Sequence, residues 1–331
     1  MCAQGRTGVL PERVSSGFAV VLALLAMALG LAACGGDGDA DTDGLEANLI
    51  QERPENRAVR LTVGSKNFTE ELILGEIYAQ ALEAGGYDVR RRLDLGSERI
   101  ALRALESGEI DAYPEYTSTA LTTFFGIPTE EVPSDARQAY EATQADFAER
   151  GLTAFPPTPF SSANAVGLLT ERADELGVRT ISDLEGIAPR LTLYGSPECR
   201  RRADCLIALQ DDYGLDFEKF VPVAIGRRYD VLDQGRADLS ILFTTDPQLF
   251  VSDNHVVLED DRDALPAGNV LFVARNQAVE RAGPRLAEIV EAVQSDLTLD
   301  VMQELNARAD IDGERPSQVA ESYLEEFGYV R

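Results

Sequence analysis

The sequence has little of what most catalytic sites need. It contains a single histidine, His255, no tryptophan, and neither a Walker loop nor a G-x-S-x-G nucleophile motif. One histidine leaves no plausible histidine-based triad, and there is no second cysteine pair to complete a zinc site. We therefore expect a protein that is not an enzyme and holds no metal ion or cofactor. His255 is predicted to be a strand residue.

Basic residues are also scarce. The chain has 30 lysines and arginines but 57 aspartates and glutamates, which gives a formal net charge of −27. A surface this acidic repels nucleic acid and anionic lipid head groups, so neither is an expected partner. Hydrophobic residues make up 44% and aromatic residues 7% of the 331 residues. This composition is typical of a globular protein with one large domain or two lobes.

The longest apolar run lies at the N-terminus. Residues 17–30 are apolar, arginines precede them, and the run Leu-Ala-Ala then leads directly into Cys34. This layout predicts a secretory signal over residues 1–33, too short for a membrane span, and it resembles the lipobox of bacterial lipoproteins. The resemblance implies that Cys34 becomes the lipidated first residue of an extracytoplasmic, membrane-anchored protein. The alternative is an ordinary signal peptide with an unrelated cysteine.

The remaining cysteines outside the signal are Cys199 and Cys205. An even pair in an oxidising compartment predicts a disulfide that closes a short loop, and two free buried thiols are the alternative. The loop itself is basic, with the sequence PECRRRADC. Arginine forks suit carboxylates, although arginines in so acidic a chain also pair with surface acids.

The rest of the chain divides into a linker and a folded body. Residues 34–59 are rich in Gly and Asp without apolar periodicity, which predicts a flexible tether, with order beginning near Arg60. Strands and helices then alternate, which favours an α/β fold with largely parallel sheets. The expected strands are 60–63, 89–93, 110–113, 165–169, 191–194, 239–243, 256–258 and 270–274. A helix capped by Thr69 is expected to reach Ala84, and three helical stretches are expected after 270–274.

A weak internal repeat suggests two lobes. LESGEID, at residues 105–111, recurs as LDQGRAD at 232–238, and at the same offset Tyr116-Thr117 matches Phe243-Thr244. Each copy is predicted to be a helix, a glycine turn and a strand whose carboxyl end carries an aromatic residue. If the copies face each other, both rings approach one cleft. Chance recurrence of glycine turns is the alternative.

Two segments carry candidate binding chemistry. Lys66, in GSKNFTEE, follows a strand and precedes a helix, where an ammonium and backbone N–H groups suit a carboxylate. Tyr116 and Thr119, in DAYPEYTST, offer an aromatic face for a quaternary ammonium beside hydroxyls for a carboxylate. The simpler interpretations are a solvated loop lysine, and core packing with helix capping.

These motifs, together with FTTD and the C-terminal SQVAESYLEEFGYV, resemble the substrate-binding lipoproteins of glycine betaine/choline-type osmoprotectant ABC importers. The similarity covers about residues 60–331. It implies a type II periplasmic-binding-protein fold: two α/β lobes, joined by two crossing strands, with the ligand cleft between them. The crossings are expected near 161–168 and 265–272. The implied division is 60–162 for the first part of lobe 1, 163–264 for lobe 2, and 265–331 for the return to lobe 1.

The resemblance also assigns ligand-binding roles. Lys66, Thr119 and Arg202 match the positions that hold a carboxylate, and Tyr116 matches one tyrosine of the cage around the ammonium. Phe243 stands where a second cage tyrosine is usual. The other two cage positions fall on Asn164 and near Gly268, neither aromatic, and Ser162 is placed with the ligand-binding residues. Other aromatic residues, Tyr113, Tyr194 or Tyr229, are candidates to replace the missing rings.

The resemblance implies a binding protein that captures a small zwitterionic osmoprotectant, such as glycine betaine or a related quaternary amine, and delivers it to the permease subunits of an ABC importer. One alternative is a different carboxylate-bearing solute. Another is a ligand-sensing lipoprotein with no transport role.

Overall fold

The computed structural model describes residues 48–331. The predicted signal, Cys34 and the first part of the predicted tether therefore lie outside the described residues. Within 48–331, no helix is both long and apolar enough to cross a membrane.

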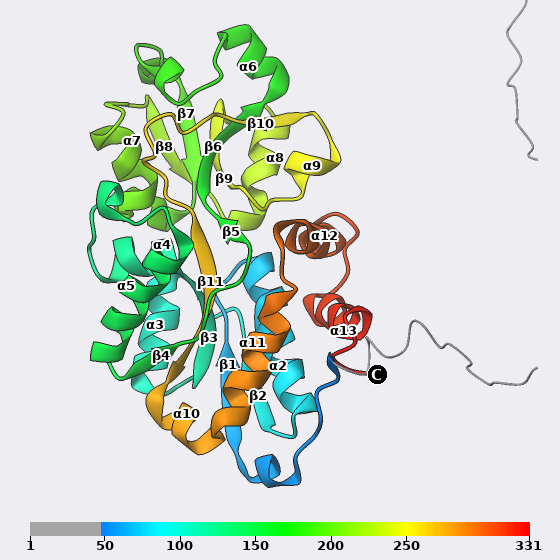
Figure 1. Cartoon of the computed structure of the whole chain (residues 1–331). Helices are drawn as coiled ribbons and strands as arrows, with labels where there is room; N and C mark the ends of the chain where they lie inside the picture. The colour runs from blue at the N-terminus through cyan, green and yellow to red at the C-terminus, as the bar shows by residue number, and fades with distance from the viewer. Residues whose placement is uncertain (1–47) are drawn as a thin grey trace, which may run out of the picture. The chain divides into compact units, whose positions relative to one another are not determined.

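The described strands form two sheets (Figure 1). The first sheet has the order β2-β1-β3-β11-β4, with β5 also paired to β11, and the second has the order β10-β6-β9-β7-β8. The strands of the first sheet are β1 (Arg60–Gly64), β2 (Asp88–Arg92), β3 (Ala112–Tyr116), β4 (Leu152–Ala154), β5 (Ser161–Ser162) and β11 (Gly268–Arg275). Those of the second are β6 (Asn164–Leu169), β7 (Thr192–Gly195), β8 (Lys219–Pro222), β9 (Leu239–Phe243) and β10 (His255–Val257).

Helices separate most of these strands. Those that precede β11 are α2 (Thr69–Ala84), α3 (Glu98–Ser107), α4 (Thr117–Thr119), α5 (Ala136–Glu149), α6 (Thr170–Leu176), α7 (Ala208–Asp211), α8 (Arg228–Asp233) and α9 (Gln248–Val251). Those that follow it are α10 (Asn276–Ala282), α11 (Pro284–Ser295), α12 (Leu299–Asp310) and α13 (Pro316–Glu326). Two short helical segments, η6 (Pro197–Arg201) and η7 (Ala203–Ile207), lie between β7 and α7.

Both sheets are mixed, so the expectation of largely parallel sheets is wrong. β1 pairs in parallel with β2 and β3, and β7 with β8 and β9. β11, however, runs antiparallel to β3, β4 and β5, and β6 runs antiparallel to β9 and β10. The chain passes from the first sheet to the second between β5 and β6 and returns between β10 and β11. The strands that carry these passages are the ones that pair antiparallel.

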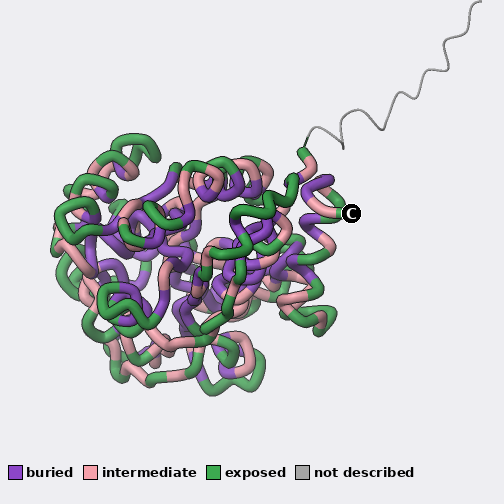
Figure 2. Tube along the Cα trace, turned by 90° about the horizontal axis from the view of Figure 1, so that it is seen from below, coloured by how far each residue is buried: buried purple, intermediate pink, exposed green. Residues whose placement is uncertain are grey.

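Each sheet has its own hydrophobic core. The first includes α2, whose Ile73, Leu74 and Ile77 are fully buried against residues of α11, α12 and α13. The second surrounds β6, β7 and β9 and includes the buried half-cystines Cys199 and Cys205. Figure 2 shows the buried residues inside the body and the exposed ones along its outer loops.

Three sequence-based expectations need correction. Thr69 is the first residue of α2, not its cap, and its hydroxyl bonds Asp310 Oδ1 at 2.6 Å. Four helices, not three, follow β11. Part of the predicted tether packs on the body, because Ile50 is 8% exposed and its N–H donates to the Tyr329 carbonyl at 3.0 Å. Order also begins before Arg60, because residues 54–58 form a short 3-10 helix and the buried Asn56 donates to the Gly85 carbonyl at 2.7 Å. Composition alone did not indicate these contacts.

The internal repeat has a structural counterpart. Asp111 before β3 accepts from the Thr62 N–H at 2.9 Å and returns its own N–H to the Thr62 carbonyl. Asp238 before β9 makes the same two bonds with Thr192, also with a 2.9 Å side-chain bond. The glycine turns that precede them have positive φ, 78° at Gly108 and 62° at Gly235. The same pair of hydrogen bonds therefore joins the start of β3 to β1 and the start of β9 to β7.

Candidate functional site

One cavity brings together all seven residues predicted to bind ligand. Its walls come from the β1–α2 loop, the end of β3 with α4, the β5–β6 passage, the η6–η7 loop and the end of β9, so both sheets contribute. The predicted residues that line it are Lys66, Tyr116, Thr119, Ser162, Asn164, Arg202 and Phe243. Their roles toward a ligand stay predictions.

Lys66 lies buried among acidic side chains. Its ammonium donates to Glu115 and lies 3.4 Å from Glu71 Oε1. Burial acts to lower the pKa of Lys66, but the neighbouring Glu115 and Glu71 outweigh it and raise the pKa. Burial also raises the pKa of Glu71 to about 8, against the opposing effect of Lys66. At neutral pH the lysine is therefore charged and Glu71 is mostly protonated.

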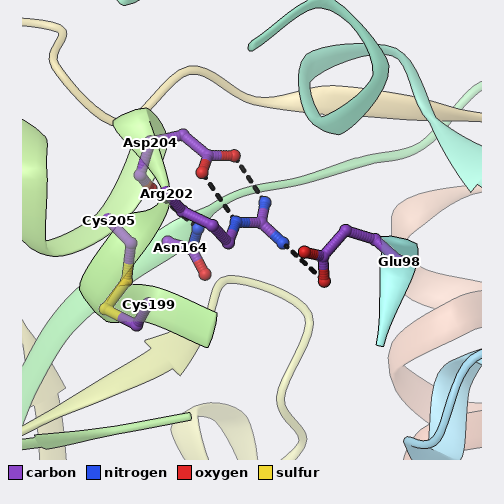
Figure 3. The surroundings of a disulfide bond; sticks show 6 residues. All are labelled: Glu98, Asn164, Cys199, Arg202, Asp204 and Cys205. Atoms are coloured by element: carbon purple, nitrogen blue, oxygen red, sulfur yellow. Dashed lines mark hydrogen bonds and ion pairs between the residues drawn. A yellow bond between two sulfur atoms is a disulfide. The ribbon is translucent and has the colours of Figure 1, made fainter. Parts of the chain in front are cut away.

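Arg202 is also paired with carboxylates of the chain (Figure 3). Its Nε and Nη2 donate to the two carboxylate oxygens of Asp204 at 2.7 and 2.5 Å, and Nη1 lies 3.9 Å from Glu98 Oε2. Nη2 also donates to the Thr119 hydroxyl at 3.1 Å. Both predicted carboxylate-binding cations therefore already have an internal carboxylate.

A disulfide holds the loop that carries this pair. Cys199 and Cys205 are joined, with their Cα atoms 5.2 Å apart. Cys205 itself lines the cavity, and the Asp204 carbonyl accepts from the Asn164 amide at 2.8 Å. The bridge and this bond fix the loop against β6.

Three aromatic rings meet at the cavity, and sequence reasoning named two of them. The Phe68 ring lies 6.3 Å from that of Tyr116 and 5.3 Å from that of Phe243, centroid to centroid. Lys66 Nζ lies 4.4 Å from the Tyr116 centroid, and the Arg228 guanidinium carbon 4.0 Å from that of Phe243. Phe68 was missed because GSKNFTEE was considered only for its lysine. An aromatic residue beside Lys66 in a strand–helix loop was the available signal.

The two cage positions without a ring have different surroundings. Asn164 pairs with Phe243 across β6 and β9 and uses its amide on the η7 backbone. At Gly268 a Cβ would lie 2.4 Å from Ser118 Oγ and 2.7 Å from Ser118 N, so no larger side chain fits there. The candidate replacements Tyr113, Tyr194 and Tyr229 do not line this cavity. Phe68 is the additional ring.

Behind the rings, hydrogen bonds connect the two sheets. The Tyr116 hydroxyl donates to Glu70 Oε1 at 2.5 Å, and Asn306 Nδ2 on α12 donates to Glu70 Oε2 at 2.8 Å. Asn306 also lies within bonding distance of the Thr245 carbonyl, and the Thr245 hydroxyl bonds Ser162. Burial raises the pKa of Glu70. Ser162 thus belongs to a polar connection across the cavity floor.

Within residues 48–331 no group of three His, Cys, Asp or Glu side chains is placed to hold a metal ion. The cavity instead combines aromatic faces, hydroxyls and paired charges, which is the chemistry of a site for a small polar solute.

Two sheets, two connecting passages and a cavity between them define a type II periplasmic binding protein. A crystal structure described as a glycine betaine/carnitine/choline ABC transporter matches with a TM-score of 0.63 and 26% identity, over 81% of this chain and 99% of that one. The chain belongs to the family of substrate-binding domains of ABC-type glycine betaine transport systems, whose model matches residues 59–326.

Two curated relatives are similar to this chain over most of its length. A glycine-betaine-binding protein of Pseudomonas aeruginosa is 33% identical over 82% of this chain and 88% of its own length. The ergothioneine transport permease/ergothioneine binding protein EgtU of Helicobacter pylori is 26% identical over 85% of this chain and 49% of its own length. The family is one of transporter substrate-binding proteins, not of enzymes.

Proposed function

We propose that this protein captures a small zwitterionic quaternary amine, glycine betaine or a close relative, and delivers it to the permease of an ABC importer. The observation that carries the proposal is the cavity in which three aromatic rings lie beside two paired cations and several hydroxyls. Aromatic faces attract a quaternary ammonium, and arginine, lysine and hydroxyl groups bind a carboxylate. The relatives' names support the same solute class.

Within this proposal the two ends of the ligand face different groups. The trimethylammonium group packs against Tyr116, Phe243 and Phe68. The carboxylate lies toward Lys66, Thr119 and Arg202 and competes there with Glu115 and Asp204. Asn164 and Ser162 form the polar wall between the two ends.

The permease is the proposed protein partner. The match to EgtU, whose name includes both a permease and a binding protein, covers about half of that chain, so a relative carries both parts in one polypeptide. We propose that lobes 60–162 with 265–331, and 163–264, close on the ligand. The permease then recognises the closed form, so ligand binding and binding to the permease are coupled.

We further propose that the protein works outside the cytoplasm, anchored by a lipid on Cys34 after removal of residues 1–33. Intact-mass measurement of protein extracted from membranes tests this proposal, because a diacylated N-terminal Cys34 has a defined mass. The Cys34→Ala variant is expected to leave the membrane fraction. Protein that stays in that fraction unmodified contradicts the anchor without affecting the solute proposal.

Titration calorimetry with glycine betaine tests the proposed function. We expect a dissociation constant in the micromolar range, roughly −8 kcal/mol. The measurement suits this chain because it contains no tryptophan to report closure by fluorescence. Absence of heat with betaine, choline and carnitine at millimolar concentration overturns the proposed solute class.

A further inference from the structure

A second cleft adjoins the ligand cavity. One of its walls is the first half of α3 and the other is the η6 loop of the second sheet. Four residues, Ser97, Glu98, Glu198 and Arg202, line both the cavity and this cleft. The cavity and the cleft therefore lie next to each other at Arg202.

Three exposed arginines line this cleft: Arg99 and Arg103 from α3, and Arg201 from η6. None of the three has a carboxylate partner among residues 48–331. Arg99 donates to the Thr123 carbonyl at 2.9 Å, whereas Arg103 and Arg201 have no side-chain partner in the described part of the chain. In a chain with 57 acidic residues, three such guanidinium groups around one cleft leave binding capacity for an anion.

The two cations of the cavity, Lys66 and Arg202, differ from these arginines because each already has a carboxylate partner. Lys66 is paired with Glu115, and Arg202 is held at two points by Asp204. An anionic group placed there must displace a carboxylate of the protein. The same group placed farther out meets Arg103 and Arg201, which have no carboxylate partner to displace among residues 48–331.

We infer that this cleft is an anion subsite for the distal charged group of a longer quaternary ammonium ligand. The class we assign is a phosphate ester of a quaternary amino alcohol. A phosphate presents several oxygens to guanidinium forks. Glu98 and Glu198 also line the cleft and repel an anion, but Arg99, Arg103 and Arg201 outnumber them there. The inference rests on the proposed function, because the ammonium end has to sit among Phe68, Tyr116 and Phe243.

Calorimetry with choline, glycine betaine and phosphocholine tests the subsite on the purified protein. Phosphocholine is expected to bind about tenfold or more tightly than choline, with a steeper loss of affinity as salt rises, because its extra contact is ionic and solvent-exposed. Arg103→Gln and Arg201→Gln are each expected to lower phosphocholine affinity roughly threefold, and the double variant about tenfold, with choline affinity unchanged. Both side chains are exposed, so these variants are expected to fold.

Arg236→Gln is the matched control, since Arg236 is exposed, has no side-chain partner among the described residues and lies outside both cavities. This variant is expected to change neither the affinity for phosphocholine nor that for choline. If choline and betaine bind but phosphocholine binds no more tightly than choline, the subsite is wrong and the proposed function stands. A phosphocholine preference that survives the double variant also overturns the subsite. If none of the three ligands binds, both proposals fail.

Discussion

Asp204 holds Arg202 in a two-point ion pair inside the ligand cavity, with bonds of 2.7 and 2.5 Å. The two residues are separated by one position in a loop closed by a disulfide, and Asp204 is 2% exposed. A ligand carboxylate that uses Arg202 therefore meets a competitor that the chain itself supplies. If a ligand carboxylate binds at Arg202 as proposed, we expect its affinity to depend on the charge at Asp204.

Asp204→Asn tests that competition. The amide keeps the size of the side chain and removes its charge, so Arg202 becomes free to pair with a ligand carboxylate. We expect glycine betaine to bind about tenfold or more tightly, because a hydrogen bond to a charged group contributes about 1.5–3 kcal/mol and about 1.4 kcal/mol is tenfold in affinity. Choline, which has no carboxylate, is expected to gain nothing. Calorimetry with glycine betaine and choline measures both affinities. An equal change in affinity for the two ligands contradicts competition between Asp204 and the ligand carboxylate.

The predicted carboxylate end is tested by Lys66→Ala and Arg202→Ala. Each variant removes a cation next to the proposed carboxylate position, so we expect betaine affinity to fall at least tenfold, equivalent to about 1.4 kcal/mol. Choline serves as the control for a general loss of structure, and thermal unfolding reports the cost of leaving Glu115 or Asp204 unpaired. Betaine titrations that match wild type in both variants would rule out the assignment.

The aromatic end is tested by Phe68→Leu, which keeps an apolar side chain and removes the ring. We expect choline affinity to fall roughly threefold to tenfold, within the range of cation–π attraction of ~0.5–2 kcal/mol. The uncharged analogue 3,3-dimethyl-1-butanol is expected to lose much less. Phe250→Leu on the exposed side of α9 is the matched control. Equal losses for the charged and uncharged ligands would mean that Phe68 contributes only apolar contact.

Much of this architecture follows from local sequence signals. The repeat around Asp111 and Asp238 correctly placed Tyr116 and Phe243 at one cavity, because a glycine turn and a strand have short-range signatures. The Cys199–Cys205 pair was predicted from the even number of cysteines left outside the signal and from the oxidising compartment, with free thiols as the alternative, and the two sulfurs are joined.

The rest depends on contacts that composition does not encode. The pairing of Lys66 with Glu115 joins residues 49 positions apart, and Asn306 reaches Glu70 across 236 positions. In a chain so rich in acids, nothing distinguishes these carboxylates from those on the surface. Phe68 was missed for a related reason, since its role depends on Tyr116 and Phe243, which arrive from different strands.

The disulfide is expected to support the site as well as the fold. Replacing Cys199 and Cys205 with serine frees a short loop, which costs roughly 2 kcal/mol of stability in the chain-entropy model. Because the loop carries Arg202 and Asp204, we also expect weaker betaine binding, measured well below the unfolding temperature. Wild-type affinity in the folded double variant would show that packing alone positions the pair.

Glu71 gives the protein a pH-dependent stability. Its pKa is raised by burial to about 8 in the folded state, whereas the unfolded chain has the ordinary value of 4.5. Between these values the folded state binds one proton more than the unfolded state, so stability falls as pH rises, by up to about 1.4 kcal/mol per unit, and levels off above pH 8. Glu71→Gln replaces the protonated acid with a neutral group that cannot ionise. Thermal unfolding from pH 5 to 9 is therefore expected to show the variant gaining on wild type as pH rises, and parallel profiles would contradict a neutral Glu71.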